Sequence, residues 1–449
     1  MDPAFRPAAL ANHAFLKRVE ESGGTALKIA LERGAGQTSV FETRVFPSGH
    51  ASAAENLPFA ERLVKTLLWA RGGWRLVLGG PREVGEHVKT TYAPGGARQF
   101  DAEFMGGVYE KPFTVEVTAP ESVPAPKEQT VAVGRHLEGC RIGFDAGASD
   151  HKVTAVVDGE PVFTEETPWD PRNQSDPEYH FQHIMTDIKH AAAHMPRVDA
   201  IGVSAAGIYI DNRVSVASLF RGVPKELFDA KVRDIFLRVQ QEWGGIPLEV
   251  ANDGDVTALA GAMSLGENAI LGIAMGSSEA AGYVTNEGNI TGWLNELAFV
   301  PVDFNPDGPV DEWSGDRGCG ALYFSQQVLR LLKGSDIPLD TSNPLPEQLE
   351  DVQALMAKGD ARVVPLYETV GRYTGYGVAY YADFYDIRHV LILGRVTTGE
   401  GGNIIMEQAR AVLREEFPRL HDHLSINLPD ERARRVGQAV AAASLPALR

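Results

Sequence analysis

The stretch Leu248-Glu-Val-Ala-Asn-Asp-Gly-Asp-Val-Thr-Ala-Leu-Ala-Gly-Ala-Met-Ser-Leu-Gly266 contains the turn around which we interpret the chain. Residues 248–251 predict a short apolar strand, and the small residues of about 256–265 predict a helix. An acid at such a turn points beyond the carboxyl end of its strand, where α/β proteins bind ligands. Asp253 is therefore a candidate general base for a substrate hydroxyl. The alternative is that Asp253 only caps the helix, because Asp is a preferred N-cap residue.

The composition indicates an ordinary globular protein. The chain has 449 residues, of which 44% are hydrophobic and 23% charged, enough for two or three domains. No apolar run reaches the roughly 20 residues that span a bilayer, and residues 1–13 lack a signal-peptide pattern. The two cysteines, Cys140 and Cys319, are too few for a disulfide framework and fit a reducing compartment. We therefore expect a cytoplasmic protein with no membrane partner.

The formal net charge of −18 bears on the partners of the protein. Binding to nucleic acid needs a clustered basic face that neutralises phosphates, so we expect no nucleic-acid partner. A nucleotide remains a possible ligand, because backbone N–H groups can hold its phosphates.

Residues 1–136 predict an α+β extension. We expect strands at 25–32, 39–46, 74–78, 99–104 and 113–118, and an amphipathic helix at 58–70. A degenerate copy of the later halves is the alternative to an unrelated extension. Residues 119–129 contain three prolines and predict an extended, poorly packed linker.

The rest of the chain predicts one pattern twice: a strand, a glycine turn, two strands, and then alternating helices and strands. The first copy spans 137–255 and is joined by a helix at 430–447; the second spans 256–429. We expect single helices at 225–243 and around 321–332. The alternation implies two mixed α/β layers of similar topology with a cleft between them.

This order resembles the superfold of actin, heat-shock-70 proteins and sugar kinases, and within it the ROK family of bacterial sugar kinases and regulators. The resemblance covers about residues 138–449. It implies two ribonuclease-H-like (actin-like ATPase) halves that flank a cleft, with the α+β domain added at the N-terminus. It is carried by Gly143-Phe-Asp-Ala-Gly-Ala-Ser149 with Lys152, Asn252-Asp253, Ala274-Met-Gly-Ser-Ser278, Asn295-Glu-Leu-Ala298, Gly318-Cys319 and Leu391-Ile-Leu-Gly394.

The glycine turns are candidate phosphate sites, because tight turns let backbone N–H groups approach an anion. Asp145 is placed to hold Mg²⁺, directly or through water. Ordinary hairpins and a plain strand-to-helix loop are the alternatives. The resemblance implies ATP and Mg²⁺ as cofactors, with three groups of nucleotide-binding residues: Asp145, Gly147, Ser149 and Lys152; Gly276, Ser277 and Ser278; and Gly394, Gly399 and Gly401.

The sequence also departs from the family pattern. Glu279 follows the second turn, and a carboxylate beside phosphates would be repulsive. Phe299 replaces a His that contacts sugar and ligates zinc in the family, and Cys319 is the only cysteine in this region, so we expect no zinc. Gly320 or Ala321 replaces a Glu, and the Asn expected near Ser218 is absent. Four residues remain as candidate substrate contacts: Asn252, Asp255, Glu296 and Ser218.

We therefore expect an ATP-dependent phosphotransferase that acts on a sugar or sugar-like polyol such as a deoxy sugar, an amino sugar or a cyclitol. The alternative is a catalytically silent protein on the same fold that senses a sugar or a nucleotide. Family resemblance further suggests a homodimer. The histidines of the helix around residues 178–194 are set aside as a solvated face.

Overall fold

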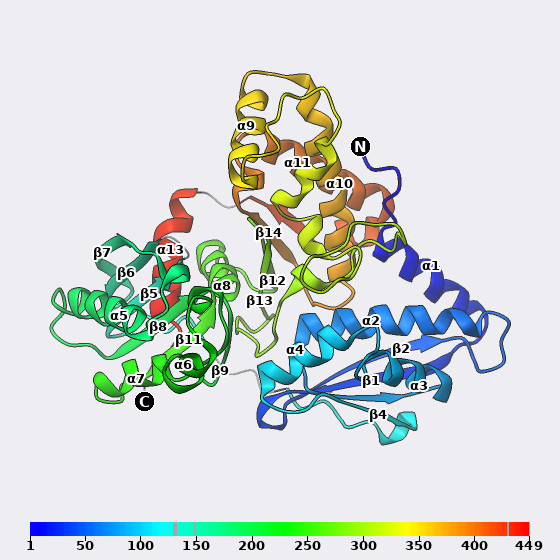
Figure 1. The fold of residues 1–449 in the computed structure, drawn as a ribbon, viewed down its shortest axis with the longest axis horizontal. Helices are drawn as coiled ribbons and strands as arrows, with labels where there is room; N and C mark the ends of the chain where they lie inside the picture. The colour runs from blue at the N-terminus through cyan, green and yellow to red at the C-terminus, as the bar shows by residue number, and fades with distance from the viewer. Residues whose placement is uncertain (129–132, 148–149, 429–430, 449) are drawn as a thin grey trace. The chain divides into compact units, whose positions relative to one another are not determined.

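The computed structural model describes residues 1–128, 133–147, 150–428 and 431–448 (Figure 1). The chain folds into two compact units. Unit 1 consists of Met1–Gln129, Ile273–Ala281 and Gly292–Leu428, and unit 2 consists of Thr130–Gly272, Gly282–Thr291 and Pro429–Arg449. No helix among the described residues combines the length and the apolar character needed to cross a bilayer.

The N-terminal part of unit 1 has an α+β fold. Its sheet has the order β2-β1-β3-β4, in which β1 is antiparallel to both neighbours and β3 is parallel to β4. In this part the first strand, β1, is antiparallel to the strand after the helix, β3. In unit 2 the first strand, residues 140–146, is parallel to the strand after the helix, residues 200–205. The N-terminal part therefore does not repeat the topology of the later halves. Its elements are α1 (Ala8–Glu21), β1 (Thr25–Glu32), β2 (Thr38–Val45), α2 (Asn56–Arg71), β3 (Arg75–Gly79), α3 (Arg82–Thr91), α4 (Gln99–Tyr109) and β4 (Thr114–Thr118).

One sequence prediction for this part was wrong, and one helix was missed. Residues 99–104 lie in helix α4 and not in a strand, and helix α1 was not predicted. Phe100 and Phe104 favoured a strand, but their spacing of four residues also places both rings on one side of a helix. In the structure both rings pack against Trp69, with centroid distances of 6.3 and 4.9 Å.

The predicted linker is largely exposed where the structure describes it, and its end pairs with the N-terminal sheet. Residues 120–122 form a 3₁₀ turn, and Lys127 exchanges two backbone hydrogen bonds of 2.9 Å with Thr38 of β2. Glu128 contacts the buried guanidinium of Arg33. The chain is thus held to the N-terminal sheet at residues 127 and 128, whereas residues 121–126 are exposed or partly buried, as expected for an extended linker.

Unit 2 is built on a five-stranded sheet of order β11-β8-β5-β6-β7. Strands β5, β8 and β11 are parallel, and β6 and β7 extend the sheet as antiparallel hairpins. The elements are β5 (Cys140–Ala146), β6 (Asp150–Val157), β7 (Glu160–Pro168), α5 (Pro177–Ala192), β8 (Ala200–Ala205), β9 (Ile208–Ile210), β10 (Arg213–Val216), α6 (Lys225–Leu227), α7 (Ile235–Glu242), β11 (Leu248–Asn252), α8 (Asp253–Leu265) and α13 (Glu431–Ala443).

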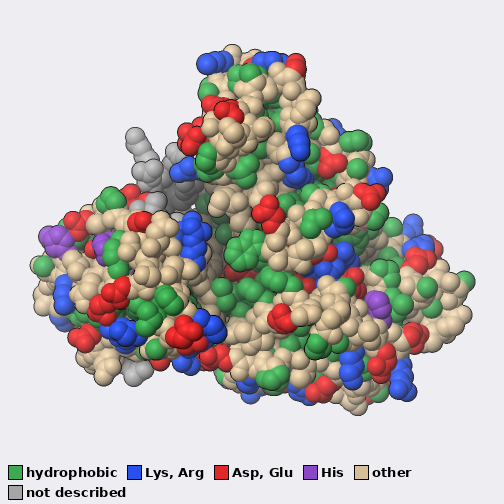
Figure 2. Space-filling model, in the orientation of Figure 1, with side chains coloured by type: hydrophobic (Ala, Val, Ile, Leu, Met, Phe, Trp, Pro, Cys, Tyr) green, Lys and Arg blue, Asp and Glu red, His purple; other side chains and the backbone are tan. Residues whose placement is uncertain are grey.

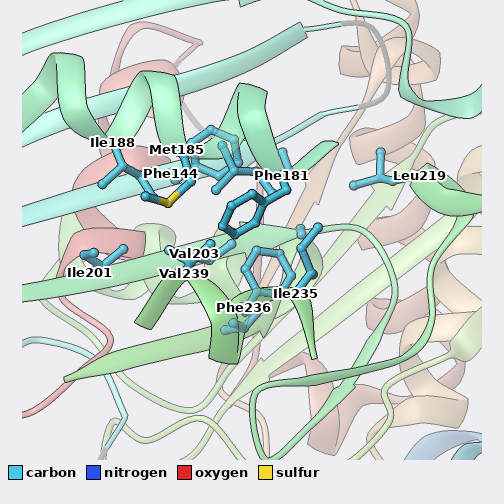
Figure 3. Close-up of a cluster of buried hydrophobic side chains, with 14 of the residues drawn as sticks. Phe144, Phe181, Met185, Ile188, Ile201, Val203, Leu219, Ile235, Phe236 and Val239 are labelled. Atoms are coloured by element: carbon cyan, nitrogen blue, oxygen red, sulfur yellow. The ribbon is translucent and has the colours of Figure 1, made fainter. Parts of the chain in front are cut away.

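The core of unit 2 lies between this sheet and helices α5 and α7. Side chains from all three meet in one cluster, including Phe144, Phe181, Val203 and Phe236 (Figure 3). Helix α13 packs against β5 and β8, and a Cβ added to Gly202 would come within 1.7 Å of the Ala442 carbonyl oxygen. This close approach requires glycine in β8.

The helix predicted over 225–243 is interrupted. Helices α6 and α7 are separated by a π-helical turn at Phe228–Val232, in which the Arg233 amide bonds to the Phe228 carbonyl. The Val214 amide of β10 donates a hydrogen bond to the Arg233 carbonyl at 2.9 Å. That carbonyl is diverted from the helix, which explains the break.

The remaining sheet has the order β13-β12-β14-β15 and carries helices of unit 1. The boundary between the units passes through β12 and β13. The helix predicted around residues 321–332 is instead two 3₁₀ segments, Gly320–Leu322 and Gln326–Leu332. The elements are β12 (Ile270–Met275), β13 (Glu279–Val284), α9 (Leu345–Ala357), α10 (Val364–Tyr381), β14 (His389–Leu393), α11 (Glu400–Glu416), α12 (Pro418–His421) and β15 (Ser425–Asn427).

Candidate functional site

The carboxyl ends of the three parallel strands of unit 2 bring two acids to one edge of the sheet. Asp145 of β5 is in register with Ser204 of β8, and Asn252 of β11 is in register with the next residue of β8. Asp253 follows directly as the first residue of α8. Because the strands are parallel, their carboxyl ends share an edge, and ligands of α/β sheets bind beyond that edge.

The structure assigns the cap of α8 to Asn252 and not to Asp253. The Asn252 Oδ1 atom accepts a hydrogen bond from the Gly254 amide at 2.7 Å, and its Nδ2 donates to the Gly207 carbonyl at 2.7 Å. Asp253 is partly buried, and its Oδ1 lies 3.0 Å from the Gly254 nitrogen. Burial raises the pKa of the Asp253 carboxyl, although hydrogen bonding to backbone amides opposes this. Asn252, and not Asp253, is therefore the N-cap residue of α8.

Asp145 lies in a mainly buried setting that includes two residues that the sequence interpretation missed. Ser204 Oγ donates to Asp145 Oδ1 at 2.7 Å, and Gln438 Nε2 of α13 lies 3.4 Å from the same oxygen. Burial raises the pKa of Asp145 to about 6; the charge of Asp253 raises it further, and the Ser204 hydroxyl and the Lys152 ammonium lower it. The two acids therefore interact electrostatically. The parallel register could have pointed to Ser204, but no local signal marks Gln438.

The first glycine turn joins β5 to β6. A Cβ added to Gly147 would lie 2.6 Å from the Asp150 carbonyl oxygen, so the turn closes too tightly for a side chain. Trp169 Nε1 donates to the Gly147 carbonyl at 2.9 Å. Lys152 sits across from Asp145 in the hairpin, with its Nζ 3.2 Å from Glu166 Oε2. The expected Ser149 lies outside the described residues.

The second glycine turn, Gly276-Ser277-Ser278, joins β12 to β13. The Gly276 amide donates to the Ser278 carbonyl at 3.0 Å, and both serine side chains are exposed. The Gly276 carbonyl accepts from the Gln326 amide at 2.9 Å. The turn is a tight hairpin that presents two hydroxyls to solvent.

Glu279, which follows this turn, corrects an expectation. It does not extend toward the turn as a charged group but is 4% exposed, and Tyr381 Oη donates to its Oε1 at 2.9 Å. Burial raises the pKa of Glu279 to about 8, and the charge of Glu296 contributes in the same direction. A protonated carboxyl at neutral pH removes the repulsion that the sequence implied.

The third glycine group leads into α11. Gly394 has φ 100°, and an added Cβ would lie 2.3 Å from the Met275 carbonyl oxygen at the end of β12. Gly399, with φ 71°, precedes the first turn of α11. A Cβ on Gly401 would lie 2.2 Å from the ring of Tyr367, so this glycine serves packing. Helix N-termini suit anionic or polar groups, and the first turn of α11 already contains the carboxylate of Glu400.

The candidate substrate contacts have distinct surroundings. The Asp255 carboxylate is buried and accepts from the Tyr283 amide at 3.1 Å, which ties α8 to β13. Ser218 is exposed at the start of a short 3₁₀ helix. Glu296, in unit 1, is partly buried, and its amide donates to the Trp69 carbonyl at 3.1 Å. The contacts of Asn252, Asp255, Ser218 and Glu296 with a substrate stay predictions.

Phe299 occupies the position where the family resemblance expects histidine. Its ring stacks on Trp69 with a centroid distance of 4.1 Å and an interplanar angle of 24°. Cys319 is buried, with its Sγ 3.9 Å from Ser314 Oγ. The expected absence of zinc stays a prediction.

Comparison of the sequence with known proteins gives no matching family model and no matching curated protein. The fold does match solved structures. A ROK hexokinase from Thermus thermophilus has a TM-score of 0.52 and 19% identity over 68% of this chain and 97% of that chain. A ROK-family glucokinase from Streptomyces griseus, solved with glucose and AMPPNP, has a TM-score of 0.50 and 21% identity over 68% and 99%.

A third match is a ROK-family transcriptional regulator, described as a homolog of the E. coli MLC protein. It has a TM-score of 0.51 and 21% identity over 69% of this chain and 79% of that chain. Identities below a quarter establish the fold and not the activity. About two-thirds of the chain therefore has the actin-like fold of ROK kinases and regulators, as the sequence predicted.

Proposed function

We propose that this chain, which has the fold of ROK sugar kinases, transfers a phosphoryl group from ATP to a hydroxyl of a sugar or sugar-like polyol. The observation that carries this proposal is the pair of acids at the carboxyl edge of the unit 2 sheet. Asp145 and Asp253 lie close enough for the charge of one to raise the pKa of the other. Phosphoryl transfer needs two such roles, a metal anchor and an acceptor base.

Asp253 is the proposed base. Because Asn252 supplies the helix cap, the Asp253 carboxylate is available to orient the acceptor hydroxyl and to take its proton as the oxygen attacks phosphorus. Partial burial makes the carboxylate a stronger base than it would be in water. The attacking and leaving oxygens are in line with the transferred phosphoryl group.

Asp145 is the proposed anchor for Mg²⁺. Oxygen ligands of this kind suit the ion, and the Ser204 hydroxyl fixes the orientation of the carboxylate. Bound Mg²⁺ would neutralise phosphate charge. The residues proposed to cradle the nucleotide are Gly147, Ser149 and Lys152, then Gly276, Ser277 and Ser278, and finally Gly394, Gly399 and Gly401.

The acceptor differs from the usual hexose. Glu296 and Asn252 are retained as proposed hydroxyl contacts, but Phe299 and either Gly320 or Ala321 replace two polar side chains of the family pattern. A site built for a hydroxyl loses about 1–3 kcal/mol when a partner is missing. A deoxy sugar, an amino sugar or a cyclitol fits this reduced set of polar contacts. Asp255 and Ser218 complete the proposed contacts.

A second candidate function is a silent sensor of a sugar or nucleotide on the same fold. The observation in its favour is the second glycine turn, where Glu279 and two alanines replace the glycines expected after the serines. A DNA-binding role is disfavoured. The N-terminal part is a sheet with flanking helices, and acidic and basic side chains are interspersed on the face drawn in Figure 2.

The proposal includes a cytoplasmic homodimer with no nucleic-acid or membrane partner. Light scattering of the purified chain tests the oligomeric state, and a monomeric mass at micromolar concentration would contradict it.

The test of function is ADP release from Mg²⁺-ATP in the presence of hexoses, deoxy sugars, amino sugars and cyclitols. Melting curves with Mg²⁺-ATP and with each acceptor are recorded in parallel. The kinase proposal predicts ADP release that depends on one acceptor class. Stabilisation by nucleotide without acceptor-dependent release would favour the sensor.

A further inference from the structure

Helix α2 of the N-terminal part ends on the segment that carries Glu296. We name residues Leu294–Val300 the acceptor loop. The last carbonyls of an α-helix have no partner within the helix. In α2, the carbonyls of Trp69 and Ala70 accept hydrogen bonds from the amides of Glu296 at 3.1 Å and Asn295 at 3.0 Å. The acceptor loop thereby completes the C-terminus of α2.

The backbone of the acceptor loop has a conformation that needs such support. Asn295 has φ 53°, in the left-handed region that non-glycine residues seldom adopt, and it is 2% exposed. Tyr385 Oη donates to Asn295 Oδ1 at 3.0 Å. The two backbone bonds to α2 and this side-chain bond therefore hold the residue that sets the direction of Glu296.

Side chains of α2 also stabilise the contact between this helix and the acceptor loop. Trp69 is fully buried, stacks on Phe299 of the acceptor loop and donates from Nε1 to Asp101 Oδ1 at 2.7 Å. One turn earlier, the buried Lys65 Nζ lies 2.8 Å from Asp316 Oδ2. Asp316 Oδ2 also forms ion pairs with Arg62 Nη1 at 2.7 Å and Arg98 Nη1 at 2.8 Å. These positive charges lower the pKa of the Asp316 carboxyl against the effect of burial.

Gly320 links the acceptor loop to the buried Glu279, because a Cβ at Gly320 would meet both Glu279 Oε2 and the Leu297 carbonyl. The Gly320 amide donates to the Val300 carbonyl at 2.9 Å, and the charge of Glu296 acts on Glu279. A Cβ added to Gly320 would lie 2.1 Å from Glu279 Oε2. The acceptor loop thus contacts Gly320 in addition to the C-terminus of α2.

We infer that the N-terminal part of the chain is a positioning element for the acceptor, acting through the end of α2 and Trp69 on the backbone of Glu296. This inference rests on the proposed function, in which Glu296 contacts the acceptor. The N-terminal part then sets affinity for the acceptor and leaves affinity for the nucleotide unchanged. Trp69 is a positioning residue, because it acts on Glu296 through the Trp69 carbonyl and the Phe299 ring.

The test compares Trp69→Phe with Trp74→Phe. Trp74 belongs to the same N-terminal part, but its indole donates to the Arg33 carbonyl at 3.3 Å, whereas the Trp69 indole donates to Asp101. Tyr385→Phe is a second, milder variant that removes only the hydroxyl bonded to Asn295. Hydrogen exchange of the peptide that spans the acceptor loop is measured together with KM for the acceptor and KM for ATP.

We expect Trp69→Phe and Tyr385→Phe to speed amide exchange in the acceptor loop and to raise KM for the acceptor about 10-fold, since small misplacements carry large kinetic effects. KM for ATP should stay within about twofold, and Trp74→Phe should change none of these quantities. Unchanged exchange in both loop variants would overturn the inference, as would equal rises in both KM values. The exchange measurement needs no turnover, so a wild-type protein without kinase activity would refute the proposed function separately.

Discussion

Glu279 offers a test that is independent of any substrate. Its carboxyl is buried at the start of β13, and Tyr381 donates a hydrogen bond to one oxygen. The other oxygen, Oε2, has no hydrogen-bond partner among the described residues. Burial raises its pKa from the ordinary 4.5 to about 8. The folded protein therefore keeps a proton on Glu279 that the unfolded chain releases near pH 4.5.

The sign and size of the effect on stability follow from proton linkage. Between about pH 4.5 and 8 the native state binds more protons than the unfolded state, so the free energy of unfolding falls as pH rises. Each pKa unit corresponds to about 1.4 kcal/mol, which gives a loss of about 5 kcal/mol above pH 8. Glu279→Gln keeps the shape and removes the titration, but its buried amide N–H groups cost about 1–3 kcal/mol.

We therefore expect Glu279→Gln to be neutral or slightly destabilising at pH 5.5 and stabilising by about 2–4 kcal/mol at pH 8.5. Urea unfolding at several pH values measures the difference. Glu287→Gln is the control, because Glu287 is exposed and hydrogen bonding to the Thr285 hydroxyl lowers its pKa. A stability difference between Glu279→Gln and wild type that does not grow from pH 5.5 to 8.5 would refute the reasoning.

Three further outcomes are expected. Burial raises the pKa of Asp145 to about 6, and Mg²⁺ needs the ionised carboxylate. The affinity for Mg²⁺-nucleotide should therefore fall as the pH drops through 6 in wild type but not in Asp145→Asn. Equal pH dependence of the two proteins in fluorescent-nucleotide titrations would exclude Asp145 as the anchor. Gly147→Ala, whose Cβ would meet the Asp150 carbonyl at 2.6 Å, should weaken nucleotide binding about 10-fold, whereas Gly107→Ala, which meets nothing within 4 Å, should not; equal affinities would remove the first turn from the site. Metal analysis of the purified protein should find no stoichiometric zinc, and one equivalent that resists chelation would overturn the match of Phe299 and Cys319 to the family pattern.

The parts of the fold that could be predicted from sequence are those with a local signal. The strand at Leu248 and the helix after Asp253 follow from periodicity, and the order of turns led to the shared fold of ROK proteins. Gly147 was predicted from the turn that it forms, and the structure gives a steric reason for it. These signals lie within a few residues of the feature that they predict.

What could not be predicted depends on contacts between distant segments. The break before α7 arises because the Val214 amide of β10 donates to the Arg233 carbonyl. The cap of α8 goes to Asn252 because Gly207, 45 residues earlier, holds its amide. Glu279 turns inward because Tyr381 of α10 offers a hydroxyl. None of these partners is adjacent in sequence, so residue patterns carried no information about them.

The central claim is that Asp253 is the general base of a phosphotransferase, and the kcat of Asp253→Asn tests it most directly. The variant keeps the size of the side chain, and Asn252 keeps the helix cap, so the melting temperature and nucleotide affinity should stay near those of wild type. Loss of a general base lowers turnover by about 10²–10⁴-fold, and we predict a fall in kcat of that size on the acceptor found in the panel. An unchanged kcat in a well-folded variant would contradict the account.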